Sequence, residues 1–349
     1  MSSPNPTCWV IDHPAHFQFF APFIRGGHEA DILVLSSRPE VQTMFRAREG
    51  RLPHRPHLWV DRPVGEGIGR FRRLILARRR LQAVRSFLRK HPLVNRVVVK
   101  GASLEILAGK KEKRMERIYI SDTESNHIAH RIALRGATNI LLPESWRESD
   151  ATQIVNDHRV KRYPGILPDI YIDTEQGISM RNQAVGQLRE SIGGMTSEKS
   201  TAPIVFHRRI IGGGIHDGDE VIDYQYWIRN LPVHFIHTKE SAIEATDGVW
   251  DMPMQIAMFD GVLTGSTTTA AEAVIHGMPT FLISKAERGF LDELESRCPD
   301  LLFRWRSTSS DGFDRTTHDW IEAMQRDRRT SQIRTDSLAF FERELGPVA

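Results

Sequence analysis

The order of apolar segments along the chain constrains its fold most strongly. Short runs rich in Val, Ile and Leu recur, and longer amphipathic stretches separate them. This alternation is typical of the strands and helices of a parallel sheet. The runs that predict strands begin at Cys8, Asp31, Arg96, Ile118 and Asn139, and again at Pro203, Val233, Gly261, Thr280 and Leu301. The sequence therefore predicts an α/β protein.

The strand pattern lapses between Tyr163 and Ala202, where turn-forming residues replace the apolar runs. At roughly 100–200 residues per domain, a chain of 349 residues favours two domains. We predict one Rossmann-like domain over residues 1–170 and a second over 171–325. A helical tail over 326–349 completes the expected organisation.

Composition narrows the class of protein. Lys and Arg number 47 and Asp and Glu 44, so the net charge of +3 excludes a polycation. The two cysteines cannot build a disulfide framework or a Cys-based zinc site. The first residues lack a signal-peptide pattern, and no apolar run approaches the roughly 18 residues that span a bilayer. We expect a cytoplasmic protein, either soluble or peripheral on the inner face of the membrane.

Histidines follow the first predicted strand, which ends at Asp12. His13 and His16 flank Pro14 at the start of the next helix, and ligands of parallel sheets lie at such carboxyl-end loops. One interpretation is structural: His13 caps the helix and His16 packs against the sheet. The other is catalytic: a general base oriented by the Asp12 carboxylate, with His13 as first choice and His16 as second, because imidazole titrates near neutral pH. No third ligand is fixed by spacing, so no metal site is predicted.

Two further strand ends carry polar side chains. Ser103 follows the run from Arg96, and the run from Ile118 ends in a polar cluster at residues 121–125. One interpretation is structural: Asp122 or Ser125 caps the next helix, which is the common use of such residues. The surplus points to chemistry, so we assign acid/base work to Glu124. The acceptor or substrate residues are predicted to be Ser103, Asp122 and Thr123.

A helix without acidic residues is predicted from Arg70 to Lys90. Its arginines include Arg72, Arg73, Arg79, Arg80, Arg85 and Arg89. An anionic membrane surface fits a basic helix that also carries Phe and Leu. The alternative is a docked helix with a basic outer face. Nucleic acid is not predicted as a partner, because stacking aromatics and a nucleic-acid-binding motif are missing.

The segment Asp260–Ile283 predicts a nucleotide site. A strand ends at Gly265, and four hydroxyl residues then open a helix. They are Ser266, Thr267, Thr268 and Thr269. Free N–H groups and the positive end of the dipole favour a diphosphate there. Glu272, among small alanines, is a candidate for ribose hydroxyls, the alternative being a solvent-facing helix residue.

A second phosphate candidate lies earlier in the same half of the chain. Arg208 and Arg209 follow His207 and precede Gly212–Gly214. Arginine pairs with phosphate in a bidentate manner, and glycine lets the backbone approach it. A surface hairpin is the structural alternative.

Several segments, in this order, resemble a known family. They read IDHPAHFQFFAPFIRGGHEADILVLSSR, VVVKGASLEILA, ISDTESNHIAHRIAL, YPGI and DGVLTGSTTTAAEAVIHGMPTFLI. The family comprises uncharacterised prokaryotic proteins of the GT-B fold. It is related to UDP-N-acetylglucosamine 2-epimerase and to the N-acetylglucosaminyltransferase that makes lipid II. The resemblance implies two Rossmann-like domains with parallel sheets facing across a cleft, and a bound nucleotide sugar.

The resemblance also suggests roles for particular residues. Glu124, the segment His207–Arg209 and Glu272 resemble functional residues of the epimerase. The chain departs from epimerases at Thr267–Thr268, at Ile210–Ile211 and in its histidine-rich first loop, which favours transfer over epimerisation.

We therefore expect a glycosyltransferase that uses a nucleotide sugar as substrate, UDP-linked, with neither cofactor nor metal. The acceptor and the oligomeric state stay open. A sugar-nucleotide epimerase and a non-catalytic nucleotide-sugar binding protein are the alternatives.

Overall fold

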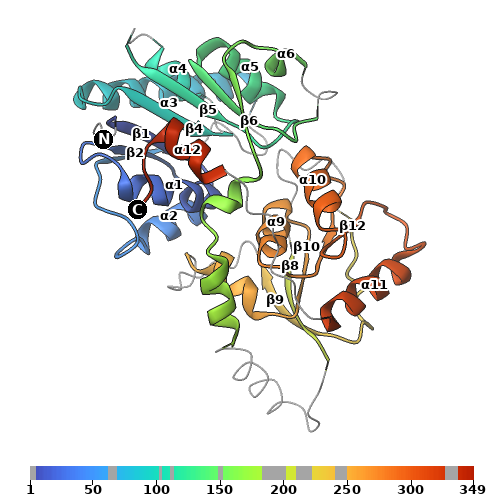
Figure 1. Cartoon of the computed structure of the whole chain (residues 1–349). Coiled ribbons are helices and arrows are strands. Elements are labelled where there is room, and N and C mark those ends of the chain that lie inside the picture. Colours follow the sequence, from blue (N-terminus) through green and yellow to red (C-terminus); the bar gives the residue numbers. More distant parts are fainter. Residues whose placement is uncertain are drawn as a thin grey trace. The chain divides into compact units, whose positions relative to one another are not determined.

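The computed structural model describes residues 5–61, 69–101, 104–110, 114–147, 152–182, 202–209, 222–239, 250–326 and 337–349. The chain forms two compact units, each built on a parallel sheet (Figure 1). Unit 1 comprises Met1–Tyr171 and Thr335–Ala349, and unit 2 comprises Ile172–Arg334. Both units are α/β, as the sequence predicts.

Unit 1 holds a seven-stranded sheet of order β3-β2-β1-β4-β5-β6-β7, parallel throughout. Its strands are β1 (Thr7–Ile11), β2 (Ile32–Ser36), β3 (His57–Val60), β4 (Arg96–Lys100), β5 (Glu116–Ile120), β6 (Asn139–Pro143) and β7 (Val160–Tyr163). Its helices are α1 (Pro14–Gly26), α2 (Pro39–Arg46), α3 (Arg70–Lys90), α4 (Ile106–Gly109), α5 (His127–Gly136), α6 (Thr152–Val155), the 3₁₀ turn η1 (Leu167–Ile170) and α12 (Ser337–Leu345).

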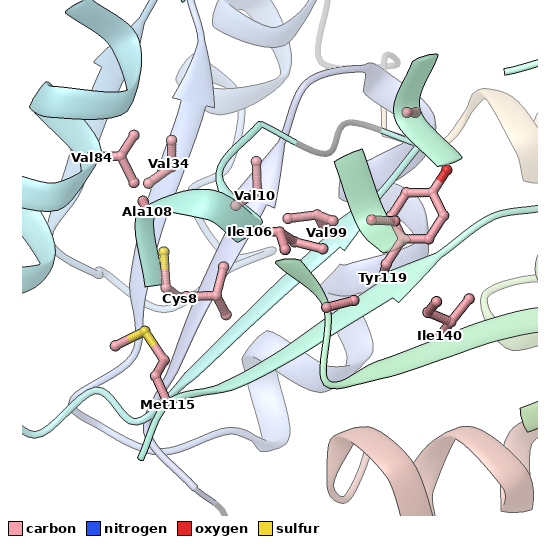
Figure 2. Close-up of a cluster of buried hydrophobic side chains, with 14 of the residues drawn as sticks. Cys8, Val10, Val34, Val84, Val99, Ile106, Ala108, Met115, Tyr119 and Ile140 are labelled. Atoms are coloured by element: carbon pink, nitrogen blue, oxygen red, sulfur yellow. The ribbon is translucent and has the colours of Figure 1, made fainter. Parts of the chain in front are cut away.

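Helices cover both faces of this sheet, which explains why its inner strands are continuous apolar runs. All five residues of β1 are buried. On one face, Cys8 and Val10 join Val84 of α3 and Ile106 of α4 in a single cluster (Figure 2). On the other face, the Trp9 ring packs on aromatic rings of α1.

Strands β3 and β7 are not among the predicted strands. They are the two edges of the sheet, and their sequences HLWV and VKRY are only partly buried. These two edge strands contact the core less than the inner strands do, and they lack the apolar run on which the prediction depends.

The end of the chain returns to unit 1. Phe341 of α12 is fully buried, with its ring against Phe19 of α1 and Tyr163 of β7. The Ser337 hydroxyl donates a hydrogen bond of 2.7 Å to the Pro164 carbonyl. Figure 1 shows α12, in red, lying against this unit. The predicted tail over 326–349 thus contributes α12 to the first unit.

Unit 2 holds a five-stranded parallel sheet of order β12-β11-β10-β8-β9. Its strands are β8 (Ile204–Arg209), β9 (His234–Lys239), β10 (Gly261–Thr264), β11 (Thr280–Ile283) and β12 (Leu302–Trp305). Its helices are α8 (Met252–Gln255), the 3₁₀ turn η3 (Ile256–Met258), α9 (Thr267–Ile275), α10 (Gly289–Arg297) and α11 (Phe313–Gln325). Phe281, Phe313 and Trp320 stack in its core.

Within the described ranges, no helix is both long and apolar enough to cross a membrane.

Candidate functional site

Strand order places the predicted site segments at the switch points of the two sheets. In unit 1 the first strand, β1, lies between β2 and β4, and in unit 2 β8 lies between β9 and β10. The chain therefore winds in opposite directions on either side of β1 and of β8. Ligands of open α/β sheets bind outside the carboxyl ends of strands at such points. The relevant loops follow β1 and β4 in unit 1, and β8 and β10 in unit 2.

The loop after β10 forms the predicted strand-to-helix turn. Ser266 is the N-cap of α9, and its hydroxyl accepts a hydrogen bond of 3.3 Å from the Thr269 N–H. The Thr264 hydroxyl accepts one of 3.0 Å from the Ser266 N–H. Gly265, Thr267 and Thr268 are half-buried along the same turn. The turn thus presents a capped helix N-terminus lined with hydroxyl groups, which is suited to an anion.

Glu272 lies on the next turn of α9 and is 3% exposed. The alternative of a solvent-facing residue is therefore wrong. Its neighbours along the helix, Ala270, Ala271 and Ala273, are buried as well. Its predicted contact with ribose hydroxyls stays a prediction.

The segment after β8 divides between the core and the strand end. His207 is 2% exposed, and its Nδ1 lies 2.7 Å from Nδ1 of His237 while its Nε2 lies 3.0 Å from the Tyr224 hydroxyl. Arg208 pairs with Thr264 across the sheet, and its carbonyl accepts a hydrogen bond of 3.2 Å from that residue's hydroxyl. The two phosphate candidates therefore meet at the switch point of unit 2.

Part of the second phosphate candidate lies outside the described residues. Arg209 is the last residue of β8, and residues 210–221, with Gly212–Gly214, fall outside the described ranges. Sequence reasoning missed Tyr224 and His237. His237 is found only through strand pairing, which sets it opposite His207.

The loop after β1 fixes both predicted histidines through backbone amides. His13 is the N-cap of α1, and its Nδ1 accepts a hydrogen bond of 3.2 Å from the Ala15 N–H. His16 is 8% exposed, and its Nδ1 accepts one of 3.2 Å from the Asp12 N–H. The predicted cap is confirmed, while a role in proton transfer stays a prediction.

Asp12 belongs to a buried charge cluster that the sequence does not reveal. Its Oδ1 lies 3.3 Å from Nη2 of Arg80, and the Arg80 Nε–H donates to Oε1 of Glu105. The three residues are 5%, 7% and 1% exposed. Glu105 follows β4, so this ion-pair cluster ties α3 to the loops at the switch point of unit 1.

Helix α3 has the bounds predicted for the basic helix, but not all of its arginines lie on an outer basic face. Arg80 points into the ion-pair cluster, and Arg85 donates a hydrogen bond of 3.2 Å to the Leu107 carbonyl. These two arginines are therefore not part of an outer basic face. Helical spacing places Phe71 and Leu74 in one apolar row with Val84 and Leu88. In the first turns, however, Phe71, Leu74 and Ile75 are 78%, 67% and 38% exposed.

The reason is that α3 packs on the sheet only from its middle onward. Val84 and Leu88 are buried, whereas residues 71–75 are exposed on every side.

The loop after β5 is built around Asp122. Its Oδ2 lies 3.2 Å from Nζ of Lys100 at the end of β4, and its Oδ1 accepts a hydrogen bond of 3.1 Å from the Thr123 hydroxyl. The structural interpretation, in which Asp122 or Ser125 caps α5, is wrong. Asn126 caps this helix by accepting a hydrogen bond from the Ala129 N–H. The side chain of Ser103 lies outside the described residues.

Glu124 is buried, with 1% exposure, and its Oε1 accepts a hydrogen bond of 3.2 Å from the Arg147 N–H. His130 holds the backbone of this loop, since its Nε2 lies 3.0 Å from the Thr123 carbonyl oxygen and 3.2 Å from that of Glu124.

Among the described residues, no three His, Cys, Asp or Glu side chains gather in a set that could hold a metal ion.

Comparison with known proteins finds similarity in three dimensions. No protein-family model and no curated protein sequence matches this chain. A Listeria monocytogenes protein assigned as a UDP-N-acetylglucosamine 2-epimerase has a TM-score of 0.61 at 9% identity, covering 97% of this chain and 94% of that one. The UDP-GlcNAc 2-epimerase from Neisseria meningitidis has a TM-score of 0.55 at 8% identity, covering 97% and 99%. The glycotransferase of kitacinnamycin has a TM-score of 0.53 at 11% identity, covering 99% and 96%.

The fold is GT-B. The GT-B fold confirms the predicted class and agrees with the family resemblance stated from the sequence. Each Rossmann-like unit of a GT-B protein has one switch point, which agrees with the switch points at β1 and β8.

Proposed function

We propose that this chain is a glycosyltransferase that moves a sugar from a UDP-linked donor to an acceptor held by unit 1. The observation that carries the proposal is the meeting of two anion-binding segments at one switch point in unit 2. The capped, hydroxyl-lined start of α9 follows β10, and β10 pairs with β8, the strand that carries Arg208. Several proteins of the same fold act on UDP-sugars, and the Neisseria meningitidis epimerase structure is bound to UDP-GlcNAc.

Each unit has a part in the proposed reaction. The start of α9 and Arg208 stabilise the negative charge that develops on the departing diphosphate. A basic group of unit 1 takes the proton of an acceptor hydroxyl, and the candidates are His13 and His16 in the loop after β1 and Glu124 in the loop after β5. The acceptor oxygen then forms a bond to the anomeric carbon as the bond to the diphosphate breaks, and UDP leaves.

A sugar-nucleotide epimerase is the second candidate, because epimerases with TM-scores up to 0.61 share the fold. The histidine-rich loop at the switch point of unit 1 favours transfer, because it is one of the departures from epimerases noted in the sequence. The need for an acceptor separates the two activities.

Glu272→Gln tests the nucleotide site. Loss of one or two ribose hydrogen bonds raises the dissociation constant for UDP by about 5- to 150-fold, equivalent to about 1–3 kcal/mol of binding free energy. Isothermal titration calorimetry measures it, with thermal unfolding to verify the fold. The matched control is Glu322→Gln on the exposed surface of α11, which leaves the affinity unchanged. Equal affinity in folded Glu272→Gln would remove this residue from the site.

We also propose that the first turns of α3 attach unit 1 to an anionic lipid surface. Phe71, Leu74 and Ile75 are exposed, and so are Arg72 between them and Arg79 one turn further along; α3 contains no acidic residue. Apolar side chains that enter the lipid interface between arginines that pair with phosphates suit such a surface. The acceptor would then be presented at that surface.

Flotation with anionic and neutral vesicles tests the attachment. At about 1 kcal/mol for each basic residue near the surface, Arg72→Gln with Arg79→Gln lowers binding to anionic vesicles by about 30-fold. The matched control is Arg131→Gln with Arg135→Gln on the exposed face of α5, which keeps binding. Equal recovery of the wild type with both lipids would contradict the proposal.

A further inference from the structure

The hydrogen bonds of the first loop determine which ring nitrogen carries the proton. His16 accepts a hydrogen bond at Nδ1 from the Asp12 N–H, and His13 accepts one at Nδ1 from the Ala15 N–H, each 3.2 Å long. A nitrogen that accepts a hydrogen bond carries no proton, so the neutral ring holds its proton on Nε2. Both rings therefore adopt the Nε2–H tautomer.

The backbone that imposes this tautomer on His16 is anchored on both sides. The Asp12 carboxylate contacts Arg80, which also pairs with Glu105 and donates a hydrogen bond of 3.3 Å to the Asp61 carbonyl. The His16 N–H donates to the His13 carbonyl at 2.9 Å. The ring of His16 is thus held between a fixed strand end and the first turn of α1.

A general base needs the opposite arrangement. Its unprotonated nitrogen must face the proton that it removes, and a carboxylate or carbonyl accepts from the other N–H. Here the Asp12 carboxylate is engaged with Arg80, and the amide of Asp12 occupies the unprotonated nitrogen of His16. Protonation of that nitrogen would set two donors against each other and break the hydrogen bond.

We propose that His16 acts as a neutral hydrogen-bond donor through Nε2–H, with Asp12 and Arg80 as positioning residues that fix its tautomer. The proposal rests on the glycosyltransferase function proposed above and assigns the roles within it. The proton of the acceptor hydroxyl then passes to a carboxylate, and Glu124, at the end of β5, is the candidate among the predicted residues. His16 donates to an oxygen of the bound substrate and keeps its proton throughout.

The tautomer is measured without any assay of activity. Full-length protein labelled with ¹⁵N-histidine gives long-range ¹H–¹⁵N correlations that distinguish Nδ1–H, Nε2–H and doubly protonated rings, and His16→Gln assigns the signal. His130 is an internal reference for a fixed ring, because Tyr119 contacts its Nδ1 at 3.1 Å and carbonyls lie at its Nε2. His158, whose side chain is 89% exposed, is the reference for an averaged ring.

At neutral pH we expect the pattern of His16 to match that of His130. An Nδ1–H pattern, a doubly protonated ring or an average like that of His158 would overturn the proposal, whether or not the protein turns over a sugar nucleotide.

Turnover tests the donor role with a conservative variant. Gln can donate a hydrogen bond from a similar position but cannot accept a proton at neutral pH. Loss of one preorganised donor in His16→Ala lowers kcat by about 10²- to 10³-fold, and His16→Gln recovers most of that loss. Equal losses in both variants, with both folded, would overturn the donor role. An inactive wild type with the expected tautomer would count against the proposed function alone.

Discussion

At the scale of single residues, Arg80 shows how unit 1 accommodates charge in its interior. Burial by itself lowers the pKa of Arg80, but the charges of Glu105 and Asp12 outweigh it and hold that pKa above its ordinary value. Asp12 and Glu105 are themselves buried, so each of the three charges depends on the others. Breaking such a cluster leaves uncompensated charge in the interior, which is more costly than the loss of an exposed ion pair.

Arg80→Met is therefore expected to destabilise the protein by about 3–5 kcal/mol. The matched control is Arg79→Met, whose side chain is exposed on the same helix and whose loss stays within about 0.5 kcal/mol. Urea unfolding followed by tryptophan fluorescence measures both. Similar values for the two variants would show that the ion-pair cluster contributes little.

Contacts between neighbouring residues are predicted from the sequence more reliably than contacts between residues that are distant along the chain. The His13 and Ser266 caps are local, and the residue types and their place before a helix predict them. The partners of Arg80 lie 68 and 25 positions away along the chain, so no local pattern relates them. The same holds for His207 and His237, which strand pairing brings together.

At the scale of elements, one arginine joins the end of α5 to the start of β7. Arg159 donates hydrogen bonds of 2.7 Å and 2.8 Å to the carbonyls of Ala137 and Leu134, and two more of 2.7 Å to the Asp157 carboxylate. The hydrogen bonds from Arg159 lower the pKa of Asp157 to about 2, against the opposing effect of burial. The connection thus depends on an ionised Asp157.

Asp157→Asn is expected to cost about 1–2 kcal/mol of stability near neutral pH. Because the folded-state pKa lies below the unfolded value of 3.8, this contribution is present above about pH 4 and is lost as the pH falls toward 2. Urea unfolding at pH 6 and at pH 3 measures the difference. Arg159→Met is the control: it removes the same ion pair together with the hydrogen bonds to Ala137 and Leu134, so its cost is larger but loses the same part at low pH. A cost for Asp157→Asn that does not shrink at low pH would contradict this account.

The elements that the sequence predicts are those with a strong apolar pattern. The ten predicted strands are present: eight are inner strands, which are buried on both faces, and two, β9 and β12, are edges of the second sheet that still carry apolar runs. The edge strands β3 and β7 lack that pattern. In α3, helical spacing alone predicts an apolar face from Phe71 onward, but the sheet supports the helix only from its middle. Periodicity reveals the face of a helix and not the length over which a sheet covers it.

At the scale of the molecule, the chain leaves unit 1 after Tyr171 and returns to it as α12. Unit 1 is therefore complete only when the last segment has folded back. Phe341 is its main anchor, with no exposed surface and aromatic contacts to Phe19 and Tyr163. The sequence predicts the two units and the helical tail, but the place where the tail packs depends on contacts too distant along the chain to predict.

Phe341→Ala is expected to destabilise unit 1 by about 3–5 kcal/mol, because it opens a cavity in a packed aromatic cluster. Leu338→Ala on the same helix is the control, since that side chain is 39% exposed. Hydrogen exchange followed by mass spectrometry locates the effect. Exchange should accelerate in β1 and β7 and stay unchanged in β10. Equal acceleration in β10 would contradict the assignment of α12 to unit 1.

The central claim is that the two switch points serve donor and acceptor in one transfer reaction. Its most direct test is incubation of the full-length protein with a panel of UDP-sugars, with and without vesicles that contain a polyprenyl phosphate. Mass spectrometry of the lipid and of the nucleotide sugar follows the products. We predict that UDP release and a sugar-bearing lipid both depend on the vesicles and are lost in Glu124→Gln. A C2 epimer of the UDP-sugar that forms equally without acceptor, with no sugar on the lipid, would contradict the claim.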